Sequence, residues 1–86
     1  MALQDTLAAA RARLVAGGIA PDEAAVDVDL FARTILGWDR ARLLTELHAP
    51  APPALEPRFS EWIARRAQKE PTAYIVGVGV FWGLEF

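Results

Sequence analysis

The fold is decided by Glu70-Pro71-Thr72-Ala73-Tyr74-Ile75-Val76-Gly77 and the following Phe81-Trp82-Gly83-Leu84-Glu85-Phe86. Here the sequence pattern changes from helical to extended. From Val80 onward every second residue is apolar: Val80, Trp82, Leu84 and Phe86 alternate with Phe81, Gly83 and Glu85. This alternation is typical of a strand with one apolar face. The backbone groups of a strand need a partner, and the sequence ends at Phe86. We therefore expect Val80–Phe86 to be an orphan β-strand of a longer protein, and we expect Tyr74 and Trp82 to be buried.

Upstream of this stretch, apolar residues recur at helical spacing. Leu3, Leu7, Ala10 and Leu14 predict a first helix that ends at Gly17-Gly18, since glycine accepts the left-handed conformation found at helix ends. Pro21 is placed to begin a second helix, which carries Val28, Phe31 and Ile35 on one face and ends at Gly37. Asp39 is a suitable N-cap for a short third helix with Leu43, Leu44 and Leu47.

The prolines between Ala49 and Pro53 must end the third helix, because proline lacks the amide donor. A fourth helix is expected from Leu55 to Lys69, with Phe59 and Trp62 as its main core residues. Pro71 then begins a segment of one to two turns that ends at Gly77. The predicted fold is all-α: a small bundle of four helices plus a short fifth. We expect residues 1–77 to form the helical domain and residues 78–86 to contain the strand that follows it.

Composition limits the class of protein. The chain has 86 residues, 53% of them hydrophobic, which suffices for one modest core and argues against disorder. It contains no cysteine, so disulfides and thiolate metal sites are excluded and a reducing cytosol fits. We see no signal peptide and no membrane-spanning stretch. A net charge of −2 and a pI near 5.2 argue against a dedicated nucleic-acid-binding protein.

No residue pattern indicates a catalytic, cofactor-binding or metal site. His48 is the single histidine, and Ser60 lacks the flanking glycines of a nucleophile elbow. Asp27 and Asp29 are two residues apart and point to different helix faces, so they cannot act as a carboxylate pair. We expect both on the solvated helix surface; the alternative is an interhelical hydrogen bond or a partner contact. The last three glycines follow a helix and enter a strand, the reverse of a phosphate-binding loop.

The fourth helix concentrates positive charge in an otherwise acidic chain. Its candidate partner-binding residues are Arg58, Arg65, Arg66 and Lys69. The alternative is a solvated helix face whose last-turn cations interact favourably with the helix dipole. Glu61 and Arg65 are spaced for an i,i+4 ion pair. Trp38 is interpreted as a residue that covers the core; the alternative is a surface anchor.

The segment from Arg65-Arg66 through Glu70-Pro71 and Tyr74-Ile75-Val76-Gly77 to Phe81-Trp82-Gly83-Leu84-Glu85-Phe86 resembles the interdomain segment of the HemK/PrmC family. These are N(5)-glutamine methyltransferases of class I peptide chain release factors. Asp27-Val28-Asp29-Leu30 and Leu36-Gly37 are also similar to that family's second helix. Residues 77–80 depart from the family, which usually has charged residues there. The family's Asn-Pro-Pro-Tyr catalytic motif does not occur in this sequence.

The resemblance implies a cytoplasmic, non-catalytic recognition domain that positions a release factor while its Gly-Gly-Gln loop enters a C-terminal methyltransferase domain. S-adenosylmethionine would bind to that domain and not to these 86 residues. The resemblance also implies that residues 78–86 form the first strand of a linker hairpin to that domain. The residues implied at the interdomain contact are Tyr74, Phe81, Trp82 and Phe86. Without the resemblance, the alternative function is a free-standing helical protein-interaction module, and a nucleic-acid-binding helix pair ranks third. No membrane and no direct nucleic-acid contact is expected.

Overall fold

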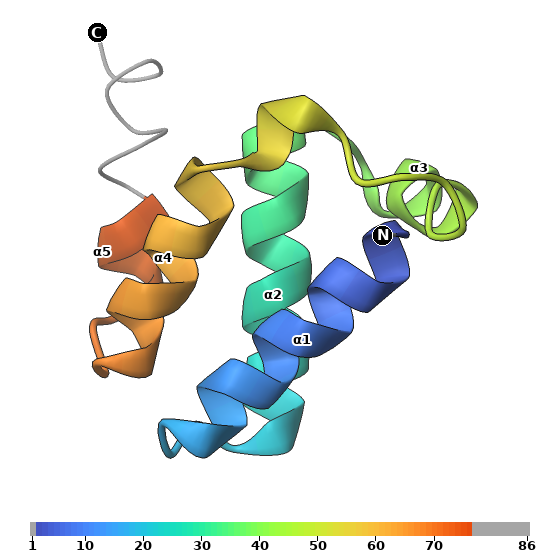
Figure 1. Cartoon of the computed structure of the whole chain (residues 1–86). Helices are drawn as coiled ribbons and strands as arrows, with labels where there is room; N and C mark the ends of the chain where they lie inside the picture. The colour runs from blue at the N-terminus through green and yellow to red at the C-terminus, as the bar shows by residue number, and fades with distance from the viewer. Residues whose placement is uncertain (1, 77–86) are drawn as a thin grey trace, which may run out of the picture.

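The computed structural model describes residues 2–76. Within this range the elements are α1 (Leu3–Ala16), α2 (Pro21–Leu36), α3 (Arg40–Thr45), a 3-10 turn η1 (Pro53–Leu55), α4 (Arg58–Ala67) and α5 (Thr72–Val76). The prediction of four helices and a short fifth is thereby confirmed (Figure 1). The only extended pairing among the described residues is an isolated bridge between Ala2 and Pro50. The strand predicted at Val80–Phe86 lies outside the described residues.

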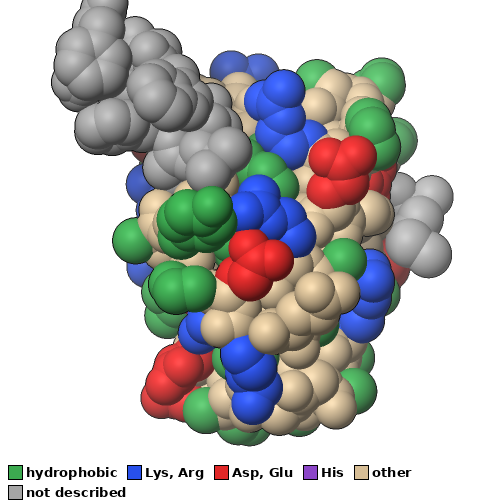
Figure 2. All heavy atoms as spheres, turned by 90° about the vertical axis from the view of Figure 1, so that its left-hand side faces the viewer, with side chains coloured by type: hydrophobic (Ala, Val, Ile, Leu, Met, Phe, Trp, Pro, Cys, Tyr) green, Lys and Arg blue, Asp and Glu red, His purple; other side chains and the backbone are tan. Residues whose placement is uncertain are grey.

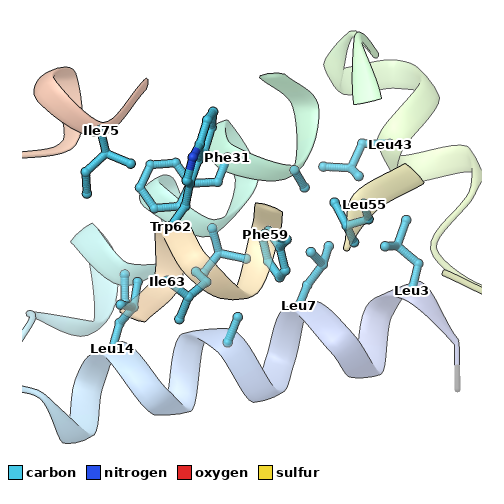
Figure 3. Packing of buried hydrophobic residues seen from close by; sticks show 14 of the residues in the cluster. Leu3, Leu7, Leu14, Phe31, Leu43, Leu55, Phe59, Trp62, Ile63 and Ile75 are labelled. Atoms are coloured by element: carbon cyan, nitrogen blue, oxygen red, sulfur yellow. The ribbon is translucent and has the colours of Figure 1, made fainter. Parts of the chain in front are cut away.

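Helices α1, α2 and α4 pack together around one apolar core (Figure 1). The predicted stripe of α1 is buried in full, and Phe31 of α2 has no exposed surface. The rings of Phe31 and Trp62 meet edge to face, with centroids 5.4 Å apart and an interplanar angle of 76°, an arrangement that aromatic pairs prefer. The core role predicted for Phe59 and Trp62 is confirmed. Figure 3 shows the core extending from Ile75 of α5 to Leu43 of α3.

The prediction for α4 was wrong at both ends. The helix begins only at Arg58, because Glu56 is extended with ψ of 153°, the conformation that a following proline favours. Leu55, expected inside α4, is instead buried in the η1 turn. At the other end the helix stops at Ala67, and Lys69 adopts a left-handed conformation with φ of 72°.

Helix α3 begins as predicted, because the Asp39 carboxylate accepts a hydrogen bond from the backbone N–H of Arg42 at 2.8 Å. The segment after α3 is tied to the start of α1, where the N–H groups of Leu3 and Gln4 donate to backbone carbonyls of the segment after Thr45. Leu43 is the buried residue of α3. Trp38 is half-buried against the core, as interpreted from the sequence.

Within residues 2–76, no helix combines the length and apolar character needed to cross a membrane.

Candidate functional site at the α4–α5 junction

The junction between α4 and α5 is a tight turn built by the backbone. The N–H of Lys69 donates to the carbonyl of Arg66 at 2.8 Å, and the N–H of Glu70 donates to the carbonyl of Arg65 at 3.3 Å. This pair of bonds is the Schellman ending of a helix. Pro71 follows, and its carbonyl accepts hydrogen bonds from the N–H groups of Tyr74 and Ile75 in α5. The turn directs α5 back against α4 and α2, where Ile75 is fully buried.

A buried ionic network joins α2, α4 and α5. The Arg66 Nε donates to one carboxylate oxygen of Asp27 at 2.7 Å, and the Thr72 hydroxyl donates to the other at 2.9 Å. The side chains of Arg66 and Asp27 are 15% and 8% exposed. Because both carboxylate oxygens have partners, the desolvation of the charge is largely offset. One aspartate therefore connects three helices.

The other nitrogens of the Arg66 guanidinium are also engaged. One donates to the backbone carbonyl of Glu70 at 3.1 Å, and another lies 3.5 Å from a carboxylate oxygen of Glu23. The planar guanidinium suits such a role, since it presents several N–H donors in a fixed geometry. The side chain thus spans from the first turn of α2 to the start of α5.

The expectation that Asp27 lies on a solvated helix surface was wrong, because its carboxylate faces α4 and α5. The alternative, an interhelical hydrogen bond, is confirmed, because Asp27 accepts hydrogen bonds from Arg66 of α4 and Thr72 of α5. Asp29 does lie on a different face, and forms an i,i+4 ion pair with Arg33 at 3.3 Å. The two carboxylates are thus separated, as the spacing predicted.

Arg65 lies on the outer side of the same turn. Its guanidinium contacts the Glu70 carboxylate at 2.9 Å and lies 5.6 Å from the centre of the Tyr74 ring. The predicted partner Glu61 is not in ion-pair contact with it among the described residues. The expected burial of Tyr74 was also wrong for the described residues, because its side chain is 60% exposed. Tyr74 is therefore a surface aromatic residue held by a cation–π contact.

The four basic residues expected to bind a partner have different surroundings. Arg66 and Arg65 have the carboxylate neighbours described above, and the Lys69 amine lies beside Gly18, at the turn after α1. Arg58, at the start of α4, is exposed and has no ion pair among residues 2–76. Figure 2 shows acidic and basic side chains interspersed on this face of the molecule. Partner binding through the four residues stays a prediction.

Three residues expected at the interdomain contact together with Tyr74 lie outside the described residues: Phe81, Trp82 and Phe86.

The residues considered for catalysis or metal binding have ordinary surroundings. His48 is exposed. Glu56 accepts a hydrogen bond from the backbone N–H of Ser60. In the range 2–76, no cluster of three or more potential metal ligands is found.

A signal for the Asp27–Arg66 pair was present in the sequence. Asp27 falls one turn before Phe31 on the apolar stripe of α2, and Arg66 falls one turn after Trp62 on that of α4. Opposite charges on two apolar stripes indicate that the stripes meet there, since a buried charge needs a partner.

The sequence matches a known protein family and several relatives that share one name. Residues 5–77 match the family described as the PrmC N-terminal domain. The chain is 42% identical over its full length to a release factor glutamine methyltransferase of Cereibacter sphaeroides, and 37% identical to one of Moorella thermoacetica. A third of that name, from Pseudomonas aeruginosa, is 39% identical over 72% of the chain. The chain covers 30%, 30% and 22% of these relatives respectively. No solved structure gives a significant match.

Proposed function

The chain belongs to the PrmC N-terminal domain family, and we propose that it is the substrate-recognition domain of a protein-glutamine methyltransferase. The proposed substrate is a class I peptide chain release factor, methylated on the glutamine of its Gly-Gly-Gln loop. The methyl donor is S-adenosylmethionine, bound by a catalytic domain and not by these helices. The proposed location is the cytoplasm, where release factors act.

The observation that carries the proposal is full-length similarity, at 42% identity, to a relative named release factor glutamine methyltransferase. Physical reasoning supports a separate recognition domain. One glutamine side chain offers too little contact to distinguish one protein from many others. Contacts remote from the reacting atom must therefore supply the discrimination and the orientation.

Two contacts are proposed in this arrangement, one with the catalytic domain and one with the release factor. Tyr74, exposed in the last described helix, is proposed to contact the catalytic domain, together with Phe81, Trp82 and Phe86. Such a contact would remove most of its exposed aromatic surface from water, which is favourable. Arg58 is the residue of the basic set that we carry forward as a release-factor contact, because it is exposed, has no ion pair in the described range and, unlike Lys69, does not lie beside Gly18.

The proposal is tested by titrating a fluorescently labelled bacterial class I release factor with the 86-residue chain. We expect saturable binding, and in a parallel calorimetric titration no saturable binding of S-adenosylmethionine. Absence of release-factor binding would contradict the recognition role. Saturable binding of S-adenosylmethionine would contradict the placement of the cofactor in the other domain.

A further inference from the structure

An open groove is lined by residues of α1, α2, α3 and the segment after α3, and by none from the α4–α5 junction. Its floor includes Val28 and Leu43, which belong to the core, so the groove reaches down to the packed interior. Leu43 anchors α3 in the core, and the segment after α3 is hydrogen-bonded to the start of α1. The volume of the groove is about 450 Å³ and it opens to solvent.

The apolar edges of this groove are unusually exposed. Val26 of α2 is 65% exposed and Leu44 of α3 is 55% exposed, and both line the groove. The other exposed large apolar residues in the range 2–76, Val15 and Tyr74, do not line it. Two exposed aliphatic side chains at the edges of a groove with apolar floor residues are the kind of surface that a partner helix can cover.

The charges around the groove are predominantly positive. Arg11, Arg33 and Arg40 line it, against one carboxylate, Asp29. Asp29 already pairs with Arg33, and the Nε of Arg33 is buried without a hydrogen-bond partner. Arg11 and Arg40 have no ion pair in the part of the chain that the structure describes. In a chain of net charge −2, this groove therefore carries uncompensated positive charge.

We propose that the groove binds an acidic amphipathic helix of the release factor, an inference that rests on the proposed function. Apolar side chains spaced one turn apart on that helix cover Val26, Leu44 and the floor between them. Its Asp or Glu side chains meet Arg11 and Arg40 at the edge. This is the helix-in-groove mode of recognition, with charge complementarity setting register and association rate.

The surface fits the alternatives less well. Nucleic acid would pair with the arginines but would leave the aliphatic edges uncovered. A small molecule would be poorly enclosed, because the groove is open. A second copy binding groove to groove in a symmetric dimer would bring two grooves of net positive charge together, which is electrostatically unfavourable.

The test uses the 86-residue chain and the release-factor titration described above. Leu44→Glu and Arg40→Glu alter exposed positions of the groove. Val15→Glu and Arg13→Glu are their matched controls, an exposed apolar residue and an exposed arginine that do not line it. Circular dichroism melting establishes that each variant is folded. We expect Leu44→Glu to weaken binding about tenfold or more and Arg40→Glu about threefold to tenfold. Both controls should stay within about twofold.

Each other outcome overturns the inference in a recognisable way. If the unaltered chain binds the release factor and the groove variants bind equally well, the groove is not the docking site and the proposed function still stands. If the unaltered chain does not bind, the proposed function fails and this inference fails with it. Sedimentation that shows a dimer of the unaltered chain, dissociated by Leu44→Glu, would assign the groove to a second copy.

Discussion

The α4–α5 junction and the α1–α2–α3 groove both carry arginines, but the two regions surround them differently. At the junction, Arg66 reaches Asp27 at 2.7 Å and Arg65 reaches Glu70 at 2.9 Å. At the groove, Arg11 and Arg40 have no carboxylate partner within residues 2–76. The same residue type thus holds helices together in one region and remains available in the other.

Positive charge in a sequence therefore does not by itself identify a binding surface. The basic run at the end of α4 attracts attention because its arginines are consecutive, yet α2 and the turn before α5 supply carboxylates that engage them. The groove arginines are scattered over α1, α2 and α3 and come together only through the fold. A binding surface is better judged by charge left unpaired than by charge density.

The largest expected contrast is between the core beside the junction and the groove, and comes from truncating an apolar side chain in each. Trp62→Ala should lower the free energy of unfolding by about 3–5 kcal/mol, because it removes a 5% exposed side chain and its contact with Phe31. Leu44→Ala in the groove should cost less than about 1 kcal/mol, since the leucine is 55% exposed. Urea denaturation followed by circular dichroism measures both. Equal losses would contradict the division between the regions.

A second contrast uses the two aspartates of α2. Asp27→Ala should destabilise the chain by about 3 kcal/mol, because it leaves the Arg66 guanidinium without its closest partner in a poorly solvated site. Asp29→Ala is the matched control and should cost about 0.5 kcal/mol, since its partner Arg33 is about a third exposed.

The same denaturation experiment can be extended to the double variant Asp27→Leu with Arg66→Met. It should be more stable than Asp27→Ala alone, because no charge remains uncompensated. The single variants Asp27→Leu and Arg66→Met complete the comparison. If the double variant loses as much free energy of unfolding as the two single variants added together, the residues do not act as a pair.

Helix endings provide a smaller contrast. Lys69→Gly should stabilise the junction by about 0.5–1 kcal/mol, because glycine adopts the left-handed conformation found at φ of 72° without steric cost. Gly37→Ala should have the opposite effect, a loss of about 1 kcal/mol, because alanine is strained at the φ of 70° found at the end of α2. The loss should not be larger, because no neighbour lies within 4 Å of an added Cβ. Thermal unfolding curves measure both shifts.

The smallest expected effect concerns an exposed arginine of the groove. Arg40→Glu should change the free energy of unfolding by less than about 0.5 kcal/mol, because Arg40 is exposed and unpaired among the described residues. A loss above about 1 kcal/mol in urea denaturation would show that Arg40 stabilises the fold, and the groove would then resemble the junction.

The parts of the fold that depend on local periodicity were predictable from the sequence. Leu3, Leu7 and Leu14 lie on one helical stripe, and all are buried. The cap of α3 by Asp39 was equally local. The limits of α4 were not predicted, because Pro57 interrupts an apolar pattern that begins at Leu55, and Lys69 adopts a backbone conformation that lysine rarely takes.

The candidate site was less predictable because it depends on contacts between distant segments. Asp27 and Arg66 are 39 residues apart, and their pairing requires α2 and α4 to meet on particular faces. Tyr74 was expected to be buried because it is aromatic, but no described helix covers it. The groove is assembled from three helices, so its open edge appears only when they are placed together.

The junction is expected to hold the fold while the groove performs recognition, and hydrogen–deuterium exchange can examine both regions at once. The chain is measured with and without a class I release factor. We expect slower exchange on binding in residues 25–30 of α2 and in α3, with little change in α5 and the last turn of α4. Protection confined to α4 and α5, with α3 unchanged, would contradict this division of roles.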